Sequence, residues 1–276
     1  MVRADREPYE GRVILDERNT MSSKLDLSKE FIGRRALVTG GSRGIGAAIA
    51  RRLLDGGARV VVAARSRGDA TPAAATFISG DVRTIEGVKA IAGDALAALG
   101  GLDILVNNAG GSRAFSTGGS ETIPDEEWQD ALALNLLSAV RLTNAVLPAL
   151  RASRAAAIVN ISSTAATMPA GSFAHYCAAK AALDTYSRAL AVELASSGVR
   201  VNVVTPGPVA TPSSDDLRKR YTDEMGLPDD AFLQQVPLGR VGATDDVAEV
   251  VALLASNRGK WLTGVNYRVD GGQTAR

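Results

Sequence analysis

Short apolar runs, many of them β-branched, alternate along the chain with longer segments that are rich in alanine and leucine. Nearly continuous apolar strands with helices between them are typical of a parallel sheet that helices cover on both faces. The pattern therefore predicts an α/β fold with a doubly wound parallel sheet. The predicted strands are 34–40, 58–64, 102–110, 156–163, 199–207 and 266–272.

The same pattern predicts one folded domain, residues 31–276, because no internal repeat or linker divides it. Residues 1–30 are charged throughout and lack the apolar core of a signal peptide, so we expect a flexible arm, with Met21 as a second candidate start. Residues 210–237 are polar and bounded by prolines. Because irregular surface segments often close over binding sites, we expect a mobile substrate lid here.

Composition narrows the classes of function. The 276 residues are 46% hydrophobic and 22% charged, and the net charge of +1 is dispersed along the chain. Such a charge pattern indicates neither a nucleic-acid partner nor a membrane surface, and no apolar run approaches the roughly 20 residues that cross a bilayer. The single cysteine, Cys177, excludes an internal disulfide and a cysteine zinc cluster. We expect a buried thiol, no metal and a cytoplasmic protein.

A glycine-rich turn joins the first strand to a helix in "ALVTGGSRGIGAAIARRLL", residues 36–54. Glycines at 40, 41, 44 and 46 let the backbone turn tightly, and the helix N-terminus offers unpaired N–H groups to a pyrophosphate. The spacing departs from the G-x-G-x-x-G fingerprint. The turn therefore predicts nucleotide binding only together with further motifs.

The turn also matches the G-x-S-x-G nucleophile elbow of α/β-hydrolases, which would make Ser42 a nucleophile. His175 would then be the base, with Asp103 or Asp130 as the acid. However, only one predicted strand precedes Ser42, and His175 falls at the start of a helix instead of in a late loop. Both observations argue against a hydrolase.

The end of the second strand bears on the choice of nucleotide. Enzymes that bind NAD usually carry Asp or Glu at this place, where it accepts from the ribose hydroxyls. This chain has Ala64 followed by Arg65. A guanidinium suits a 2′-phosphate, which a carboxylate would repel, and Arg43 in the glycine turn could reach the same group. These residues favour NADP over NAD.

Tyr176 and Lys180 lie four residues apart in a predicted helix and therefore on one face. In isolation the pair is an ordinary polar helix surface. A cation about 4 Å away, however, would lower the pKa of the phenol by the roughly 2 to 3 units that proton transfer near neutrality needs. The spacing alone therefore leaves the role of the pair open, whereas His175 and Cys177 point elsewhere on the helix and are expected to pack.

Several motifs, taken together and in order, resemble the short-chain dehydrogenase/reductase family from about residue 33 onward. They are "TGGSRGIG" (39–46), "GDV" (80–82), "NNAG" (107–110), "ALALNLLS" (131–138), "IVNISS" (158–163), "YCAAK" (176–180), "VNVVTPGPVATP" (201–212) and "LTGVNYRVDGG" (262–272). The resemblance implies a single-domain Rossmann fold and a homotetramer formed through the helices at 125–152 and 175–197.

The resemblance also implies a catalytic tetrad of Asn135, Ser163, Tyr176 and Lys180. Ser163 is preferred to Ser162 because it lies thirteen residues before the tyrosine, the usual spacing of the family. In this assignment Tyr176 is the general acid and base, and Ser163 holds the substrate oxygen. Lys180 additionally binds the nicotinamide ribose, and Asn135 anchors a water that returns protons.

Further residues are implied as cofactor contacts. Asp81 and Val82 would lie beside the adenine, Asn108 near the adenosine ribose, and Pro206 and Gly207 around the nicotinamide. The implied contacts are Gly40, Ser42, Arg43, Gly44, Ile45, Gly46, Arg65, Asp81, Val82, Asn108, Ala109, Gly110, Tyr176, Lys180, Pro206, Gly207, Val209 and Thr211.

The substrate is less determined. Residues 236–272 resemble the 3-oxoacyl-[acyl-carrier-protein] reductase branch, which implies an NADPH-dependent reductase of a ketone or 3-oxoacyl compound. An NAD(P)-dependent alcohol or sugar dehydrogenase is the alternative, and a non-catalytic nucleotide-binding regulator would require a broken tetrad. Arg154 stands where that branch presents a base to an acidic carrier, but Ser196 and Ser197 lie where a second base is expected.

Overall fold

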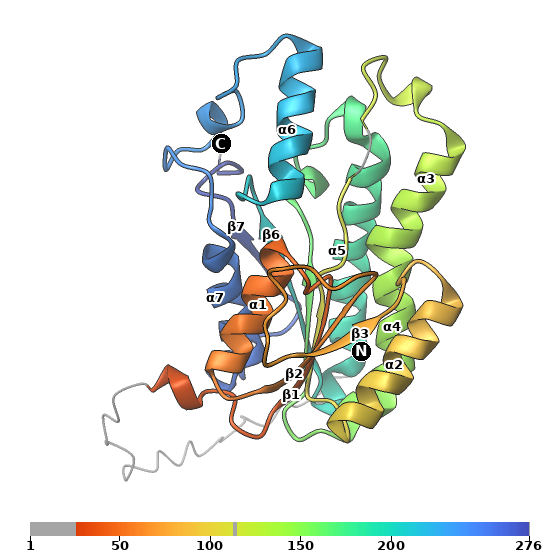
Figure 1. The fold of residues 1–276 in the computed structure, drawn as a ribbon, viewed down its shortest axis with the longest axis vertical. Helices are drawn as coiled ribbons and strands as arrows, with labels where there is room; N and C mark the ends of the chain where they lie inside the picture. Colours follow the sequence, from red (N-terminus) through yellow and green to blue (C-terminus); the bar gives the residue numbers. More distant parts are fainter. Residues whose placement is uncertain (1–25, 113–114, 276) are drawn as a thin grey trace, which may run out of the picture.

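Seven parallel strands form one sheet in the computed structural model, which describes residues 26–112 and 115–275 (Figure 1). The strand order is β3-β2-β1-β4-β5-β6-β7, and every neighbouring pair is parallel. The order reverses between β1 and β4, as in doubly wound nucleotide-binding sheets. The predicted fold class is confirmed. The strands are β1 (Arg35–Thr39), β2 (Arg59–Ala64), β3 (Thr76–Ser79), β4 (Ile104–Asn107), β5 (Ala157–Ile161), β6 (Arg200–Pro206) and β7 (Asn266–Val269).

The six predicted strands are present, each within the predicted range or shorter by a few residues. The sequence pattern missed β3. This strand has four residues at the edge of the sheet, and Ile78 is its one buried side chain. A short edge strand of this kind carries no continuous apolar run, so its sequence does not differ from that of a loop.

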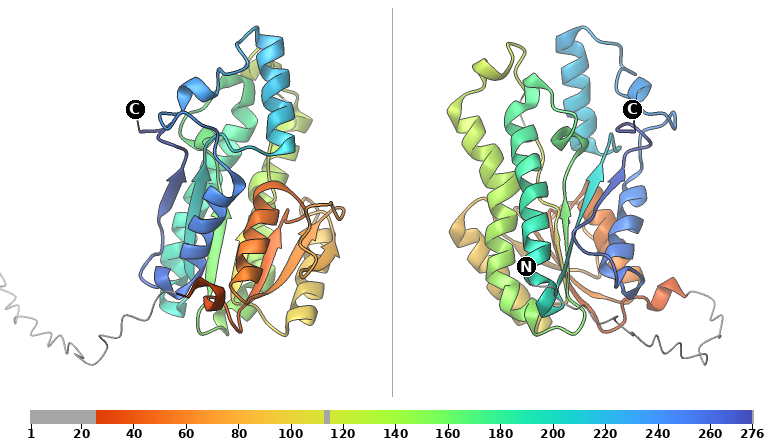
Figure 2. Two further views of the ribbon diagram at one scale, coloured as in Figure 1. Left: turned by 60° about the vertical axis from the view of Figure 1, so that its left-hand side comes forward. Right: turned by 180° about the vertical axis from the view of Figure 1, so that it is seen from behind.

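Helices cover both faces of the sheet (Figure 2). One apolar core lies between the sheet and α1 and α7, and a second lies between the sheet and α2, α4 and α5. Both cores are built from Val, Ile, Leu and Ala side chains of the central strands, as expected for strands that are buried on both faces. The helices are α1 (Gly44–Asp55), α2 (Ile85–Leu99), α3 (Asp125–Leu132), α4 (Ser138–Arg151), α5 (Ala174–Leu194), α6 (Pro212–Met225) and α7 (Thr244–Ala255).

A π-helical turn, Ala133–Leu137, joins α3 to α4, so that one continuous helix runs over Asp125–Arg151. Among the described residues this helix alone is long and apolar enough, by length and composition, to cross a membrane, which qualifies the expectation that no stretch approaches that length. Core helices of globular proteins pass the same test. Here the helix packs against α2 and α5, and Arg141 donates from Nη1 to the backbone oxygen of Arg83 at 2.7 Å.

Folded structure begins before the predicted domain boundary at residue 31. Asp26 caps a 3₁₀ turn, Leu27–Lys29, and Glu30 binds Arg52 at 2.5 Å and Arg258 at 2.7 Å. These ion pairs join residues that are far apart in the sequence, so no local pattern shows them. The rest of the predicted arm, together with Met21, lies outside the described residues.

The predicted lid segment, 210–237, contains α6 and a 3₁₀ turn at Leu233–Gln235. Thr211 caps α6 by accepting from the backbone N–H of Ser214 at 3.2 Å, and Pro212 occupies the first turn, where its missing N–H costs nothing. α6 stands at the end of the molecule where the strands finish (Figure 1). The segment therefore lies beside the carboxyl ends of the strands, where ligands bind in folds of this class. Its mobility remains a prediction.

Candidate active site

The glycine turn between β1 and α1 leaves no room for side chains. Gly40 has a φ of +65°, which favours glycine, and a Cβ atom on Gly46 would lie 2.4 Å from both the Gly40 oxygen and the Asn108 Nδ2. Arg43 precedes α1 and its side chain forms no capping hydrogen bond. The first N–H groups of α1 and its dipole therefore suit an anion. The turn fits the pyrophosphate group of a dinucleotide.

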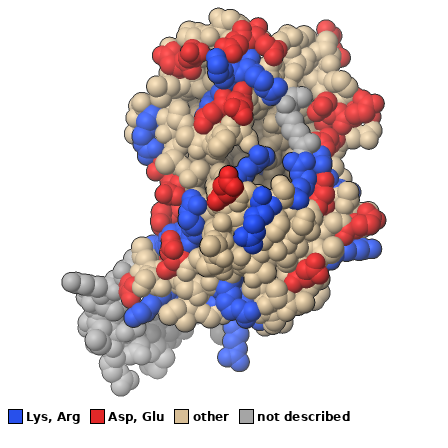
Figure 3. Space-filling view, in the orientation of Figure 1, with Lys and Arg blue, Asp and Glu red and all other residues tan. Residues whose placement is uncertain are grey.

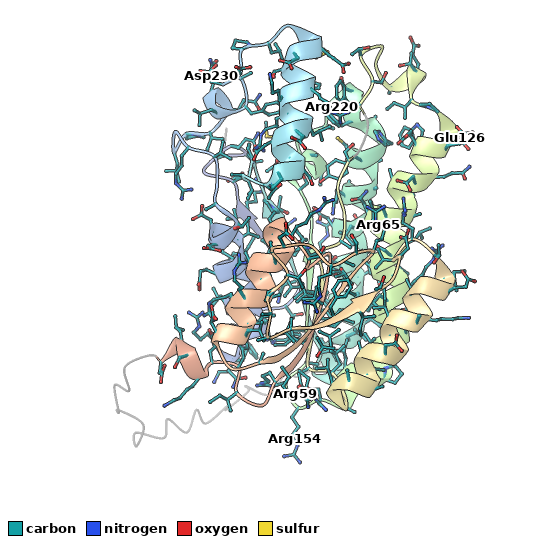
Figure 4. All side chains as sticks on the ribbon, viewed as in Figure 1. Arg59, Arg65, Glu126, Arg154, Arg220 and Asp230 are labelled. Atoms are coloured by element: carbon teal, nitrogen blue, oxygen red, sulfur yellow. The ribbon has the colours of Figure 1, made fainter. Side chains whose placement is uncertain are left out.

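The two arginines that were expected at the nucleotide both lie on the surface beside this turn. Arg43 and Arg65 are exposed, and the backbone oxygen of Arg65 accepts from Ser79 Oγ at 3.0 Å. Figure 4 shows Arg65 near the middle of the molecule, at the level where the strands end, and Figure 3 shows Lys and Arg side chains around a hollow in this region. The arrangement can take a phosphate that is attached to the adenosine ribose.

Asp81, at the end of β3, is engaged in an ion-pair network that the sequence did not reveal. Arg83 binds its carboxylate through Nη2 at 2.6 Å and through Nε at 3.1 Å, and it also binds Asp130 through Nη1 at 2.8 Å. Hydrogen bonds from Arg83 hold the pKa of Asp81 below its usual range. Asp81 therefore helps to hold Arg83 in place between β3 and α3. Val82, next to it, is buried and offers an apolar side chain to an adenine.

Asn108 and Thr39 hold the end of β4 against the glycine turn. Asn108 Nδ2 donates to the backbone oxygens of Thr39 at 2.8 Å and Gly40 at 3.3 Å. Thr39 Oγ1 accepts from the backbone N–H groups of Asn108 at 3.0 Å and Ala109 at 2.9 Å. This tie was not predicted. It gives the amide nitrogen of Asn108 partners within the protein, apart from the predicted contact with the ribose.

The π-helical turn carries Asn135 into the site. Its Oδ1 accepts from the backbone N–H of Gly111 at 2.8 Å, and its Nδ2 donates to the oxygens of Gly111 at 3.1 Å and Ala131 at 3.0 Å. A Cβ atom on Gly110 would lie 2.9 Å from Asn135 Oδ1 and 3.0 Å from Lys180 Nζ. Asn135 and Lys180, which are distant in the sequence, therefore meet over one glycine after β4.

Lys180 is buried, with 3% of its surface exposed, and its Nζ donates to the backbone oxygen of Ile161 at 2.7 Å. Burial lowers the pKa of Lys180 from 10.5 to about 8, and the charge of Asp184, one helical turn further on, opposes this shift. Asp184 accepts from Asn266 Nδ2 at 3.0 Å. This buried carboxylate behind the lysine was not predicted, because a single Asp in a helix is an ordinary residue in the sequence.

Tyr176 lies in the first turn of α5, and its ring centroid is 5.9 Å from Lys180 Nζ. The prediction that Lys180 lowers the pKa of the Tyr176 phenol was wrong. Burial raises the pKa of Tyr176, and a hydrogen bond with Ser163 opposes this shift. Ser163 follows β5, and its Oγ also accepts from the backbone N–H of Ala165 at 3.2 Å. The four predicted residues thus gather where β4 and β5 end.

The chain that follows β6 passes over the same edge. Gly207 packs so closely on Asp270 that a Cβ atom would lie 2.8 Å from it, and Val209 is buried and pairs with Gly242. The methyl group of Thr211 faces Gly44, where a Cβ atom would lie 3.2 Å from it. The segment that was predicted around the nicotinamide therefore runs from the end of β6 to the glycine turn.

The hydrolase alternative was wrong, because its three groups do not meet. Ser42 is buried in the turn after β1. Asp103 precedes β4, at the opposite edge of the sheet, and binds Arg35 at 2.9 Å. His175 is buried with its ring 6.2 Å from that of Trp128, and its Nδ1 has no hydrogen-bond partner among the described residues. Burial lowers the pKa of His175.

Cys177 is buried, as predicted. Within residues 26–112 and 115–275, no group of three or more His, Cys, Asp or Glu side chains could hold a metal ion. Arg154 projects from the end of the molecule opposite α6 (Figure 4), and Ser196 and Ser197 are exposed after α5. In a single chain, Arg154 is therefore remote from the site that a carrier would have to reach.

Known proteins resemble the chain over most of its length. Residues 40–274 match a family model described as enoyl-(acyl carrier protein) reductase. The 3-oxoacyl-[acyl-carrier-protein] reductase FabG of Escherichia coli is 38% identical over 249 residues, which cover 88% of this chain and 98% of that protein. Levodione reductase has a TM-score of 0.84 at 28% identity, covering 89% of this chain and 99% of that one.

A further solved structure, L-sorbose reductase of Gluconobacter frateurii with NADPH and L-sorbose, has a TM-score of 0.80 and 32% identity, covering 90% of this chain and 99% of that one. These relatives are named reductases, and the likeness extends from the glycine turn to the end of the sheet. The predicted family and the prediction of an enzyme are confirmed: the chain belongs to the short-chain dehydrogenase/reductase family of oxidoreductases.

Proposed function

We propose that the protein reduces a ketone or a 3-oxoacyl carbonyl compound with NADPH. The observation that carries this proposal is the meeting of Tyr176, Lys180, Ser163 and Asn135 at the edge of the sheet to which the glycine turn also opens. Reduction of a carbonyl group needs one hydride at carbon and one proton at oxygen. The four side chains lie where they can supply the proton and hold the oxygen.

Tyr176 is the proton donor in this proposal. Because burial raises its pKa, the phenol is protonated near neutral pH and can give its proton to the substrate oxygen as the carbonyl becomes an alcohol. Ser163, which is hydrogen-bonded to Tyr176, holds the same oxygen and fixes the direction in which the carbonyl carbon faces.

Lys180 and Asn135 complete the site. Lys180 Nζ is fixed by the Ile161 oxygen and lies 5.9 Å from the ring centroid of Tyr176, and we assign it the predicted role of binding the nicotinamide ribose. Asn135 is held rigidly by Gly111 and Ala131, and we assign it the predicted role of anchoring a water on the path that returns the proton.

The residues around the glycine turn fit NADP(H), which when bound supplies the hydride. The N-terminus of α1 would hold the pyrophosphate, and Arg43 and Arg65 would bind the 2′-phosphate. No carboxylate stands at Ala64 to select NAD. L-sorbose reductase, which matches this chain with a TM-score of 0.80, was solved with NADPH. The remaining implied contacts, from Asp81 to Thr211, are proposed for the adenine, ribose and nicotinamide as predicted.

A sugar or alcohol dehydrogenase that works in the oxidative direction is the second candidate. It is favoured by the structural match to the aldohexose dehydrogenase of Thermoplasma acidophilum, which has a TM-score of 0.80 at 30% identity and covers 91% of this chain and 97% of that one. We also propose a homotetramer in the cytoplasm, built on the helices over 125–152 and 175–197. Size-exclusion chromatography with light scattering checks the assembly, and a monomer would contradict it.

Titration with NADPH and NADH, followed by fluorescence, tests the cofactor. A panel of ketones, sugars and 3-oxoacyl thioesters, followed by absorbance of the reduced cofactor, tests the reaction. We expect tighter binding of NADPH and oxidation of NADPH by one class of carbonyl compound. Equal binding of NADH would contradict the cofactor assignment. Turnover only of alcohols or sugars with the oxidised cofactor would replace the proposal with the second candidate.

A further inference from the structure

Four aromatic rings from four separate segments meet near Tyr176. Phe115 lies in the loop after β4, Phe173 directly before α5, Tyr221 on α6 and Phe232 after α6. The ring centroids of Phe115 and Tyr221 are 5.3 Å apart, those of Phe173 and Tyr221 5.4 Å, and those of Tyr221 and Phe232 5.9 Å. These distances are typical of favourable ring contacts. We call these four residues the aromatic cluster, with Tyr221 at its centre.

The aromatic cluster is separate from the apolar cores that hold the sheet and helices together. None of its members belongs to either core, and all four side chains are only half-buried. The cluster nevertheless contains three of the five phenylalanines in the chain. Half-exposed aromatic rings gathered at a catalytic edge are a surface suited to binding, because stability alone would be better served by full burial.

The position of the aromatic cluster relative to the catalytic side chains is fixed at two points. Phe173 precedes Tyr176 by three residues, and the backbone N–H of Ser116, next to Phe115, donates to the Ser172 oxygen at 3.0 Å. The loop after β4, the start of α5 and the second half of α6 therefore meet at the aromatic cluster, three residues along the chain from Tyr176.

α6 links this space to the glycine turn. Thr211, which caps α6, contacts Gly44, and Tyr221 lies ten residues further along, roughly 15 Å up the helix. A cofactor at the glycine turn and a substrate at the aromatic cluster would thus lie along the same helix. The cluster is at the substrate end of this arrangement.

We infer that the aromatic cluster is the wall of the substrate pocket and selects a carbonyl compound whose carbonyl belongs to, or is attached to, an apolar ring. This inference rests on the proposed function. To admit a substrate, the rings of Tyr221 and Phe173 must part. A ring on the substrate replaces their contacts with contacts of the same kind. A linear acyl thioester has no ring of its own. The rings that part to admit it therefore lose their ring contacts without replacement.

The test compares three variants with the wild type. Tyr221→Ala removes the central ring, Tyr221→Phe keeps the ring without its hydroxyl, and Lys219→Ala changes an exposed residue of the same helix that pairs with Asp223. Substrates are a cyclic ketone, an aryl ketone and a linear 3-oxoacyl thioester of similar carbon number. For the ring ketones we expect Tyr221→Ala to raise KM about tenfold at nearly unchanged kcat. Tyr221→Phe should lose much less than Tyr221→Ala, because it keeps the ring, and Lys219→Ala should behave as wild type.

Binding supplies a readout that does not depend on turnover. Calorimetric titration of the protein with the cyclic ketone, in the presence of the oxidised cofactor, should show about tenfold weaker binding in Tyr221→Ala alone. If no carbonyl compound is reduced, the proposed function fails, and this titration still decides the inference. Equal losses for the ring ketones and the thioester, unchanged binding in Tyr221→Ala, or a wild-type preference for the thioester would each overturn it.

Discussion

The glycine turn and the aromatic cluster lie under the two ends of α6 and are built in opposite ways. At the glycine turn, backbone atoms contact backbone atoms so closely that a Cβ atom on Gly46 would lie 2.4 Å from its neighbours. At the aromatic cluster, half-buried side chains from four segments share a space. The part proposed to bind the cofactor is thus fixed by the backbone, whereas the part proposed to bind the substrate is formed by side chains.

The strongest test concerns Tyr176. Tyr176→Phe should lower kcat roughly a thousandfold, because the phenol is the proposed proton donor, while NADPH binding stays within about twofold. Single-turnover kinetics and a fluorescence titration measure the two quantities separately. Because the ring is retained, the fold should not change. Turnover close to wild type would remove Tyr176 from the mechanism.

One added methyl group should disrupt the close backbone contacts of the glycine turn. Gly46→Ala should destabilise the fold by roughly 1 to 3 kcal/mol and abolish cofactor binding, because the added atom collides with Gly40 and Asn108. Gly93→Ala is the matched control: its Cβ would meet nothing within 4 Å, and in the middle of α2 alanine should stabilise by about 0.5 to 1 kcal/mol. Urea unfolding measures both. Equal effects would contradict the close approach.

The charged surface beside the turn should affect the choice of cofactor and leave the fold intact. Arg65→Ala should weaken NADPH binding about tenfold to a hundredfold and change NADH binding little, because the lost contacts are those to the 2′-phosphate. Arg59→Ala is the control, since Arg59 begins β2 and Arg65 directly follows the other end of that strand (Figure 4). A similar loss for NADH would place Arg65 at a group that both nucleotides share.

The last effect concerns the buried charge of Lys180 and is confined to alkaline pH. Its pKa is about 8 in the folded protein and 10.5 as the ordinary value, so between these pH values the unfolded chain binds more protons. The free energy of unfolding should therefore rise with pH across this window, by at most about 1.4 kcal/mol per pH unit, with no such slope below pH 8. The difference between wild type and Lys180→Met isolates this contribution. A flat difference between pH 8 and 10 would contradict the depressed pKa.

Much of the fold could be predicted, because its signals are local. Six strands are apolar runs, and the helices over 125–152 and 175–197 follow the predicted ranges closely. The exceptions arise from contacts between distant residues. β3 is too short and too exposed to show a pattern, and Glu30 is held by Arg52 and by Arg258 near the other end of the chain.

The site divides in the same way. Tyr176 and Lys180 could be recognised by their helical spacing and the glycine turn by its composition, because each is a local pattern. Asn135 came only from the resemblance, since a π-helical turn has no sequence signal of its own. The Arg83 network, Asp184 behind Lys180 and the aromatic cluster join residues that only the folded chain brings together.

At the π-helical turn, Ala133–Leu137, the direction in which the Asn135 side chain points depends on the number of residues in the turn as well as on the residue itself. A regular α-helix rotates by about 100° per residue, so one residue fewer in this turn would swing the amide away from Gly111 while leaving the helix on both sides intact. A single deletion could thus displace the proposed catalytic amide without changing any active-site side chain. Chains of this family that keep every motif residue can therefore still differ in the register of this one helix.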